Sequence, residues 1–230
     1  MRRYWFKQAY IESGWALGVT VVIDKHGVIN TVQANTRPDG AKVIDRSAIP
    51  GIPNSHCHAF QRVMAGLTEK NSATTDSFWS WRKTMYGFAH QITPDDQRAI
   101  AAQLYMEMLK SGYTSVAEFH YLHHQASGQP YDDPAELSIA IIEAAQEAQI
   151  NLTLLPVLYM NSDFGGADLQ PKQQMFANTP AQYQALLAGL ANRYGQSSCF
   201  RLGAAFHSLR AVTPQAITLT LEALQQIDET

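Results

Sequence analysis

The sequence predicts an α/β fold, in which a small β-rich unit over residues 1–47 precedes four β/α units over residues 48–230. Two observations predict this fold. Val, Ile and Thr are enriched before residue 48, whereas an apolar run followed by a helical segment recurs four times after it. Such alternation is typical of a parallel sheet with right-handed crossovers. The later runs are apolar throughout, so we expect both faces of their strands to be covered.

Tight turns divide the first 47 residues into short strands. Lys25-His26-Gly27 predicts one turn and Asp39-Gly40 predicts another. The strand-like runs around these turns are WALGVTVVID, GVINTVQA and AKVIDR. We expect a β-sandwich-like unit of two layers, which is too small to be stable without packing on something else.

Thr-Pro pairs mark the helix starts of the larger unit. They occur at Thr93-Pro94, Thr179-Pro180 and Thr213-Pro214, and they place an N-cap Thr before a Pro at the first helical position. Asp133-Pro134 predicts a fourth helix start, and a further helical segment is expected near Ala59. The expected strands are AIPGIPN, TSVAEF, NLTLLPVLY and RLGAAF.

A doubly wound sheet and a β/α barrel both fit this order of elements. Neither G-x-G-x-x-G nor G-x-x-x-x-G-K-[ST] occurs, so the nucleotide-binding version of the doubly wound fold lacks its fingerprint. A complete eightfold barrel takes about 250 residues, and only about 180 follow the first unit. If the fold is a barrel, the sequence contains half of one.

Composition excludes several classes of protein. The 230 residues include 17 Lys and Arg against 20 Asp and Glu, and the formal net charge is −3. The 46% hydrophobic and 16% charged content argues against a disordered chain and against a nucleic-acid partner. No apolar run suits a membrane, and MRRYWFKQAY lacks the apolar core of a signal peptide. Two cysteines, Cys57 and Cys199, make no disulfide framework, so we expect a cytoplasmic protein.

The most specific chemical pattern is His56-Cys57-His58, which follows the first apolar run of the larger unit. Residues i and i+2 of a strand point to the same face, so the two imidazoles converge while Cys57 points to the opposite face. Two imidazoles at a strand end suit a divalent metal such as Zn²⁺. The alternative is a pair of hydrogen-bonded polar residues with no ligand.

Histidines also follow the expected strand TSVAEF. These histidines are His120, His123 and His124. His120 and the neighbouring Tyr121 lie nearest the strand end and are the better candidates for a site. For His123 and His124 we favour a loop in which each ring is satisfied or solvated.

A third candidate group, His207 and Arg210, follows the expected strand RLGAAF. This pair offers a proton donor and a fork for a carboxylate. The alternative is an exposed arginine beside a helix-capping loop. Other hydrolytic motifs, G-x-S-x-G and H-E-x-x-H, do not occur.

The segment PGIPNSHCHAFQRVMAGLTE resembles the opening metal motif of the amidohydrolase superfamily, in which H-x-H ends the first barrel strand. Further segments are similar to the formimidoylglutamate deiminases within that superfamily, over nearly all of residues 48–220. They are FQRVMAGLTE, DSFWSWRKTMYGFA, LYMEMLKSGYTSVAEFHYLHH, LLPVLY and HSLRAVTP. The resemblance implies the first half of an amidohydrolase-type (β/α)8 TIM barrel.

The resemblance also implies an activity and a site. One divalent metal, usually Zn²⁺, would activate water to hydrolyse N-formimino-L-glutamate to N-formyl-L-glutamate and ammonia. The first two metal ligands fall on His56 and His58. The substrate-binding residues implied by the matching motifs are Gln61, Arg82, Tyr121, His207 and Arg210, with the two arginines expected to hold the carboxylates. The family usually has Pro where this sequence has Phe206, a change expected to tilt the loop that carries His207.

The family's later half supplies a third metal His, a Glu that handles protons, a catalytic His and a metal-binding Asp. The catalytic residues are therefore unknown within this sequence and are expected beyond Thr230, and we expect the 230 residues alone to be inactive. Two alternatives stay open: an amidohydrolase deaminase or amidase that acts on a ring, and a non-catalytic metal-binding or dimerising half-barrel. The expected partners are a small dicarboxylate amidine and either a second copy or the missing half, because open sheet edges favour association.

Overall fold

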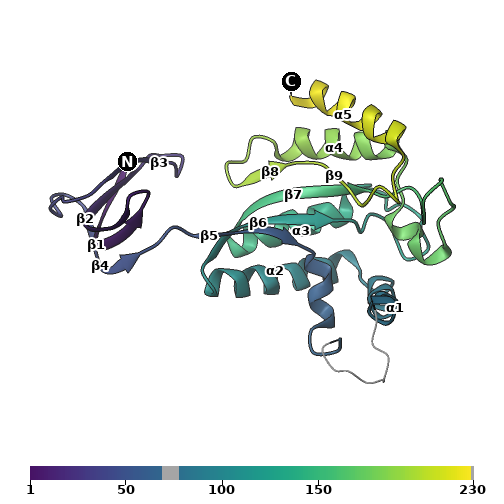
Figure 1. The fold of residues 1–230 in the computed structure, drawn as a ribbon, viewed down its shortest axis with the longest axis horizontal. Coiled ribbons are helices and arrows are strands. Elements are labelled where there is room, and N and C mark those ends of the chain that lie inside the picture. Colours follow the sequence, from purple (N-terminus) through teal and green to yellow (C-terminus); the bar gives the residue numbers. More distant parts are fainter. Residues whose placement is uncertain (69–77, 229–230) are drawn as a thin grey trace. The chain divides into compact units, whose positions relative to one another are not determined.

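The computed structural model describes residues 1–68 and 78–228 (Figure 1). The chain divides into two compact units, Met1–Ile52 and Pro53–Thr230. Within the described part of the chain, no helix is long and apolar enough to cross a membrane.

The first unit is one four-stranded sheet of order β3-β2-β1-β4. Its strands are β1 (Arg2–Ile11), β2 (Gly14–Ile23), β3 (Ile29–Gln33) and β4 (Lys42–Ala48). β2 pairs antiparallel with β1 and β3, whereas β4 pairs parallel with β1. The two layers that we expected form a single layer, because the four strands pair side by side in one order. Both predicted turns are present, with Gly27 and Gly40 at φ of +86° and +67°.

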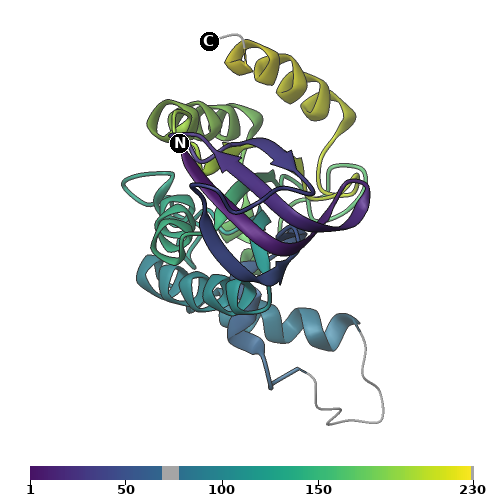
Figure 2. The same ribbon diagram turned by 90° about the vertical axis from the view of Figure 1, so that its left-hand side faces the viewer.

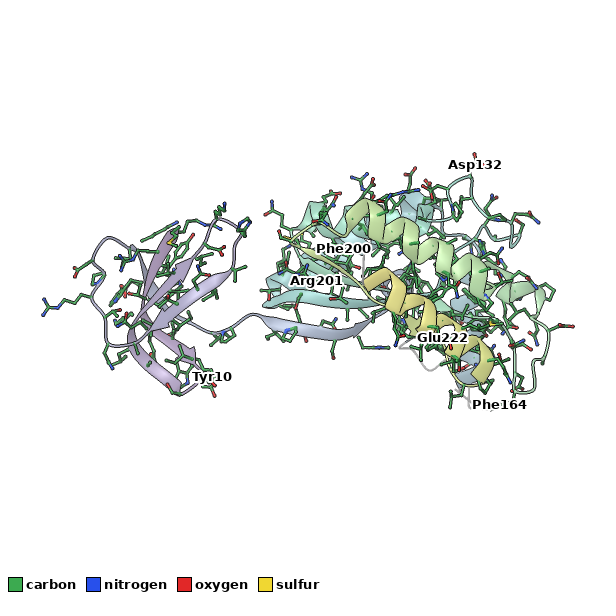
Figure 3. All side chains as sticks on the ribbon, turned by 90° about the horizontal axis from the view of Figure 1, so that it is seen from above. Tyr10, Asp132, Phe164, Phe200, Arg201 and Glu222 are labelled. Atoms are coloured by element: carbon green, nitrogen blue, oxygen red, sulfur yellow. The ribbon has the colours of Figure 1, made fainter. Side chains whose placement is uncertain are left out.

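One face of this first sheet is apolar and concave. A hollow of about 720 Å³ is lined by side chains that include Tyr4, Phe6 and Val21. Tyr10 lies near the end of β1 (Figure 3). Its ring packs edge-on against that of Trp15 with 5.4 Å between centroids. A small sheet is stable only when such an apolar face packs against other parts of a protein.

The second unit alternates strands and helices around a parallel sheet of order β5-β6-β7-β8, with β9 also pairing with β7. Its strands are β5 (Ile52–Cys57), β6 (Tyr113–His120), β7 (Asn151–Leu158), β8 (Phe200–Leu202) and β9 (Ala205–Phe206). Its helices are η1 (Ala59–Met64), α1 (Phe78–Ala89), α2 (Pro94–Lys110), α3 (Glu136–Ala148), η2 (Pro171–Phe176), α4 (Pro180–Tyr194) and α5 (Pro214–Asp228).

The helices of this unit cover one face of the sheet. Alternate side chains of β6 and β7, such as Val116, Leu152 and Leu154, are buried in a cluster with residues of α2, α3 and α4. The side chains between them, such as Thr153 and Leu155, are partly exposed. The helices follow one another along an arc outside the strands (Figure 2). This arrangement favours a barrel over a doubly wound sheet. The expectation that both strand faces are covered holds only in part, because Val157, on the same face of β7 as Thr153 and Leu155, is 0% exposed.

The Thr-Pro pairs start helices as predicted. Thr93 caps α2 through a reciprocal pair of bonds: its hydroxyl accepts from the Asp96 N–H at 3.2 Å, and the Asp96 carboxylate accepts from the Thr93 N–H at 3.0 Å. Thr179 and Gln182 form the same capping box on α4. The Thr213 hydroxyl accepts from the Ala216 N–H at 3.2 Å in the first turn of α5.

Two elements differ from their predicted bounds. Asp133 accepts from the Ala135 N–H at 2.9 Å and so stabilises a turn, and α3 begins only at Glu136. The run RLGAAF divides into β8 and β9 around Gly203, where an added Cβ would lie 2.6 Å from the Leu155 side chain. Any larger residue at position 203 would therefore displace the Leu155 side chain of β7.

Replacing Thr93 by alanine should lower the free energy of unfolding by about 1 kcal/mol, because the N-cap hydroxyl is lost from the longest helix. Urea denaturation followed by circular dichroism measures this change. Thr218→Ala is the matched control, because Thr218 is an exposed residue in the interior of α5. A loss in Thr93→Ala no greater than that in Thr218→Ala would contradict the capping role.

Candidate active site

A cavity of about 310 Å³ lies where β5, β6, β7 and β9 reach their carboxyl ends. It is lined by His56, His58, Gln61, Trp81, Arg82, Met85, Tyr86, Phe119, Tyr121, Tyr159, Phe176, His207 and Arg210. All seven residues that the sequence assigned to the metal or the substrate are among them. This is also the end of a parallel sheet at which β/α folds place their active sites.

The two imidazoles at the end of β5 converge inside this cavity. The Nε2 atoms of His56 and His58 are 3.0 Å apart. The His58 Nδ1 atom lies 3.0 Å from the Phe119 carbonyl oxygen. Because that oxygen can only accept, Nδ1 carries the proton and Nε2 presents a lone pair. Burial lowers the pKa of His58, the bond to Phe119 raises it, and the neighbouring His56 lowers it further.

This pair fits a divalent metal as part of a ligand set. Tetrahedral ligands at roughly 2.0–2.1 Å from one zinc ion are about 3.3 Å apart, close to the observed separation. A backbone carbonyl that fixes the tautomer of a histidine is a typical partner of a metal ligand. Catalytic zinc usually takes three protein ligands, whereas residues 1–68 and 78–228 contain no group of three His, Cys, Asp or Glu placed to hold an ion.

A buried carboxylate, Glu118, lies behind the histidine pair on the helix side of the sheet. Its Oε1 accepts from the Ala59 N–H at 2.6 Å, and its Oε2 accepts from the Tyr105 hydroxyl at 3.1 Å. The residue is 1% exposed, and burial raises its pKa. Cys57 is buried in the same layer, as expected, and burial raises the pKa of its thiol. Sequence reasoning missed Glu118, although a Glu within an apolar strand was an available signal.

Two guanidinium groups reach the cavity from different elements. The Nε of Arg82, on α1, donates to the Tyr86 hydroxyl at 2.8 Å, and the guanidinium lies 5.0 Å from the centroid of the same ring. The Nη1 of Arg210, in the loop after β9, donates to the Ser162 carbonyl oxygen. Each guanidinium therefore contacts at least one neighbour that restrains it.

His207 shares the cavity with both arginines. Its ring centroid lies 4.4 Å from that of Tyr159. The backbone N–H of His207 donates to the Leu158 carbonyl oxygen at 3.1 Å. Burial, together with the positive charges of Arg210 and Arg82, lowers the pKa of His207 to about 4. The ring is therefore neutral at pH 7, so it can share an N–H or accept a proton but does not act as an imidazolium acid.

Gln61 and Tyr121 form a polar pair beside the histidines. The Gln61 side-chain amide donates to the Tyr121 hydroxyl at 2.8 Å. The Tyr121 ring meets the His58 ring edge-on at 5.5 Å between centroids. Burial raises the pKa of Tyr121, so its hydroxyl keeps its proton at neutral pH and can donate it to a bound molecule.

His120 lies outside the cavity, and its choice as a site candidate was wrong. Side chains alternate along β6, so Phe119 and Tyr121 face the cavity while His120 faces the helices. His120 is 2% exposed, with its ring 5.6 Å from that of His123. The period of two would have separated Tyr121 from His120.

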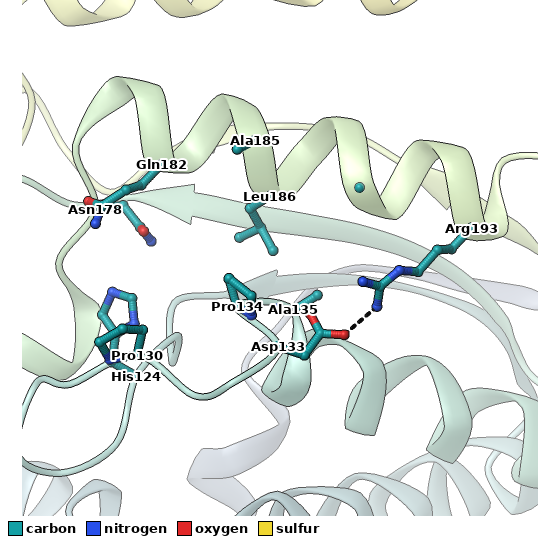
Figure 4. A pocket seen from close by; sticks show the side chains of 11 residues that line it. His124, Pro130, Asp133, Pro134, Ala135, Asn178, Gln182, Ala185, Leu186 and Arg193 are labelled. Carbon is teal, nitrogen blue, oxygen red and sulfur yellow. Dashed lines mark hydrogen bonds and ion pairs between the residues drawn. The ribbon is translucent and has the colours of Figure 1, made fainter.

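The two other histidines that follow β6 contact backbone carbonyl oxygens through Nε2, as the favoured interpretation expected, but the Nδ1 of His124 is buried without a hydrogen-bond partner among the described residues. His123 Nε2 lies 2.9 Å from the Val157 carbonyl oxygen, and His124 Nε2 contacts the carbonyl oxygen of Ala177. His124 lines a different cavity of about 270 Å³, beside the start of α4 (Figure 4). That cavity is mostly apolar and is bordered by an ion pair between Asp133 and Arg193 at 2.5 Å.

Sequence reasoning did not find the aromatic wall of the active-site cavity. Tyr86 comes from α1, Tyr159 from the segment after β7 and Phe176 from η2. The ring of Phe176 lies 5.6 Å from that of Tyr86 and 5.8 Å from that of Tyr159. These residues belong to no local motif, because they meet only when elements separated along the chain pack together.

Comparison with known proteins agrees with this geometry. The chain is 46% identical over 217 residues to a formimidoylglutamate deiminase of Pseudomonas aeruginosa. The matched region covers 94% of this chain and 48% of that protein. The crystal structure of an amidohydrolase from Brucella melitensis superimposes with a TM-score of 0.91 at 40% identity, covering 98% of this chain and 50% of that one. The chain thus spans about half the length of these relatives.

More distant structures share the fold. An atrazine chlorohydrolase from Arthrobacter aurescens, crystallised with zinc, superimposes with a TM-score of 0.77 at 16% identity and covers 99% of this chain and 51% of that one. The second unit is accordingly the first half of an amidohydrolase-type (β/α)8 barrel. The amidohydrolase family model matches residues 47–228, so the chain belongs to the amidohydrolase family.

Proposed function

We propose that the whole protein hydrolyses N-formimino-L-glutamate to N-formyl-L-glutamate and ammonia, with one divalent metal, zinc, as cofactor. The observation that carries this proposal is the pairing of two converging imidazoles with two guanidinium groups in one cavity of about 310 Å³. The 46% identity to a formimidoylglutamate deiminase supports the same substrate. We also propose a cytoplasmic location, since Cys57 and Cys199 are both free thiols.

His56 and His58 would hold the metal through their Nε2 atoms. A divalent cation bound there supplies Lewis-acid chemistry that lowers the pKa of water from 15.7 to about 7. The protein contributes the orientation of His58, whose ring is fixed by the Phe119 carbonyl oxygen. Burial keeps that ring neutral and available as a ligand, because it lowers the pKa of His58.

Arg82 and Arg210 would bind the two carboxylates of the substrate. An arginine fork matches a carboxylate in shape and charge, and two forks in one cavity suit a dicarboxylate better than a neutral ring. Tyr86 and the Ser162 carbonyl oxygen restrain the two side chains before the ligand arrives. The neutral His207 and the Tyr121 hydroxyl then supply uncharged hydrogen bonds to the rest of the molecule.

Replacing Arg82 or Arg210 by methionine should weaken binding of N-formimino-L-glutamate about 10- to 100-fold, because a charge-assisted hydrogen bond contributes about 1.5–3 kcal/mol. Isothermal titration in the presence of zinc measures this change. Arg98→Met is the control, because Arg98 lies on α2 in exposed ion pairs with Glu143 and Glu147. Unchanged affinity in both cavity variants would contradict the dicarboxylate substrate and favour a ring substrate.

Affinity for the dicarboxylate should separate the catalytic proposal from a purely metal-binding one. The described residues offer two metal ligands, so we propose that the 230 residues alone bind ligand without releasing ammonia. A non-catalytic dimerising half-barrel would instead bind zinc and show no affinity for the dicarboxylate. β5 and β8 form the edges of the sheet, and we propose that the rest of the protein or a second copy covers them.

A further inference from the structure

Glu118 is a buried carboxylate with no part in the chemistry proposed above. It lies between the sheet and α2, near Tyr105 and Cys57, and is 1% exposed. Withdrawing a carboxylate from water costs several kcal/mol unless hydrogen bonds compensate for it. The partners of its two oxygens therefore indicate what the residue does.

One of those partners follows His58 directly in the chain. Oε1 of Glu118 accepts from the Ala59 N–H at 2.6 Å, a shorter bond than the 3.1 Å bond that Oε2 accepts from Tyr105. The next residue of β6, Phe119, accepts from His58 Nδ1 at 3.0 Å. Two successive residues of β6 thus hold the two residues that directly follow β5, one through the backbone and one through the ring.

The two bonds act at different points of His58. The bond to Phe119 sets the tautomer and the ring plane, whereas the bond from Ala59 to Glu118 sets the direction of the chain where β5 gives way to η1. His58 has φ −132° and ψ 83° at this change of direction. If the chain were free to turn here, the His58 ring would lose its position relative to His56.

We propose that Glu118 is a positioning residue that holds His58 in its metal-binding orientation through the Ala59 N–H. This inference rests on the metal site of the proposed function. Partners that orient metal ligands typically change metal affinity by 10- to 100-fold when they are removed. Glu118 itself touches neither the cavity nor a ligand within it, since it faces the helix side of the sheet.

The test is a Zn²⁺ titration of the chain against a chromogenic chelator. Glu118→Leu should weaken zinc binding 10- to 100-fold. Glu118→Gln should bind zinc nearly as well as the unaltered chain, because its amide oxygen can still accept from Ala59. Tyr105→Phe is the matched control: it removes the bond to the other carboxylate oxygen and leaves the Ala59 bond in place. Equal losses in Glu118→Leu and Tyr105→Phe would overturn the proposal, because they would indicate a general packing defect.

A metal-free measurement keeps the inference separate from the proposed function. Nitrogen-15 NMR of the His58 ring should show the Nδ1–H tautomer in the unaltered chain and in Glu118→Gln, and a tautomer mixture in Glu118→Leu. Glu118→Asp, whose shorter side chain draws the oxygen away from Ala59, should behave like Glu118→Leu. It replaces Glu118→Leu in both measurements if the leucine variant does not fold. Wild-type zinc affinity and tautomer in both would overturn the inference. If the 230 residues bind no zinc without the ligands that the rest of the protein would supply, the tautomer still tests the role of Glu118.

Discussion

Replacing His58 by alanine should weaken zinc binding by more than 100-fold. His56 and His58 present two Nε2 atoms 3.0 Å apart, so both can ligate one ion, whereas a single imidazole loses the chelate. The loss should exceed the 10- to 100-fold effect of removing a residue that only orients a ligand. Competition with a chromogenic chelator measures the affinity, and elemental analysis after dialysis measures the stoichiometry.

His26→Ala is the matched control for this experiment. His26 is an exposed histidine in the turn after β2, in the other compact unit. Its removal tests whether zinc is taken up by histidines in general. Wild-type zinc affinity in His58→Ala, or an equal loss in His26→Ala, would exclude the cavity as the metal site.

Acidification should destabilise the fold through its buried histidines. Burial lowers the pKa of His123 to about 4 in the folded chain, against 6.5 for an ordinary histidine. The bond to Val157 raises this pKa and the neighbouring His124 lowers it, but burial dominates. Because the folded state binds the proton more weakly than the unfolded state, the stabilisation is complete above about pH 6.5 and is lost as the pH falls towards 4.

The expected loss from His123 is about 3 kcal/mol over the whole window and about 2 kcal/mol by pH 5. His120 acts in the same direction, because burial also lowers its pKa and its Nε2 is buried without a hydrogen-bond partner among the described residues. Urea denaturation at a series of pH values measures the slope. His123→Gln keeps an N–H for the Val157 carbonyl oxygen and does not titrate, so its stability should fall less steeply. Parallel slopes for the two proteins would contradict the role of His123.

Local features of the sequence were sufficient for the helix starts and for the histidine pair. Thr93 and Thr179 cap their helices because the capping box involves residues only three apart. His56 and His58 share a face because of the period of two in a strand. Interactions of such short range depend little on the rest of the fold, so they can be read directly from the residue order.

For residues in strands, the sequence did not show whether a side chain faces the helices or the cavity, because this depends on what packs against each face of the sheet. His120 and Tyr121 are adjacent in the sequence, yet one faces the helices and the other faces the cavity. The apolar runs also suggested two covered faces, whereas the helices of the second unit cover one. Composition states that a strand is apolar but does not state which neighbour buries it.

Sequence by itself determined the family resemblance, the order of β/α units and seven of the residues that line one cavity. Only the tertiary structure showed that Arg82 and His207, which are 125 positions apart in the chain, approach closely enough for the arginine charge to lower the pKa of the histidine. The tertiary structure also revealed the role of Glu118, which accepts a hydrogen bond from the N–H of Ala59, 59 positions away in the chain. The physical reason is that these contacts depend on strand register and on sheet curvature, which arise from packing across the whole unit rather than from neighbouring residues.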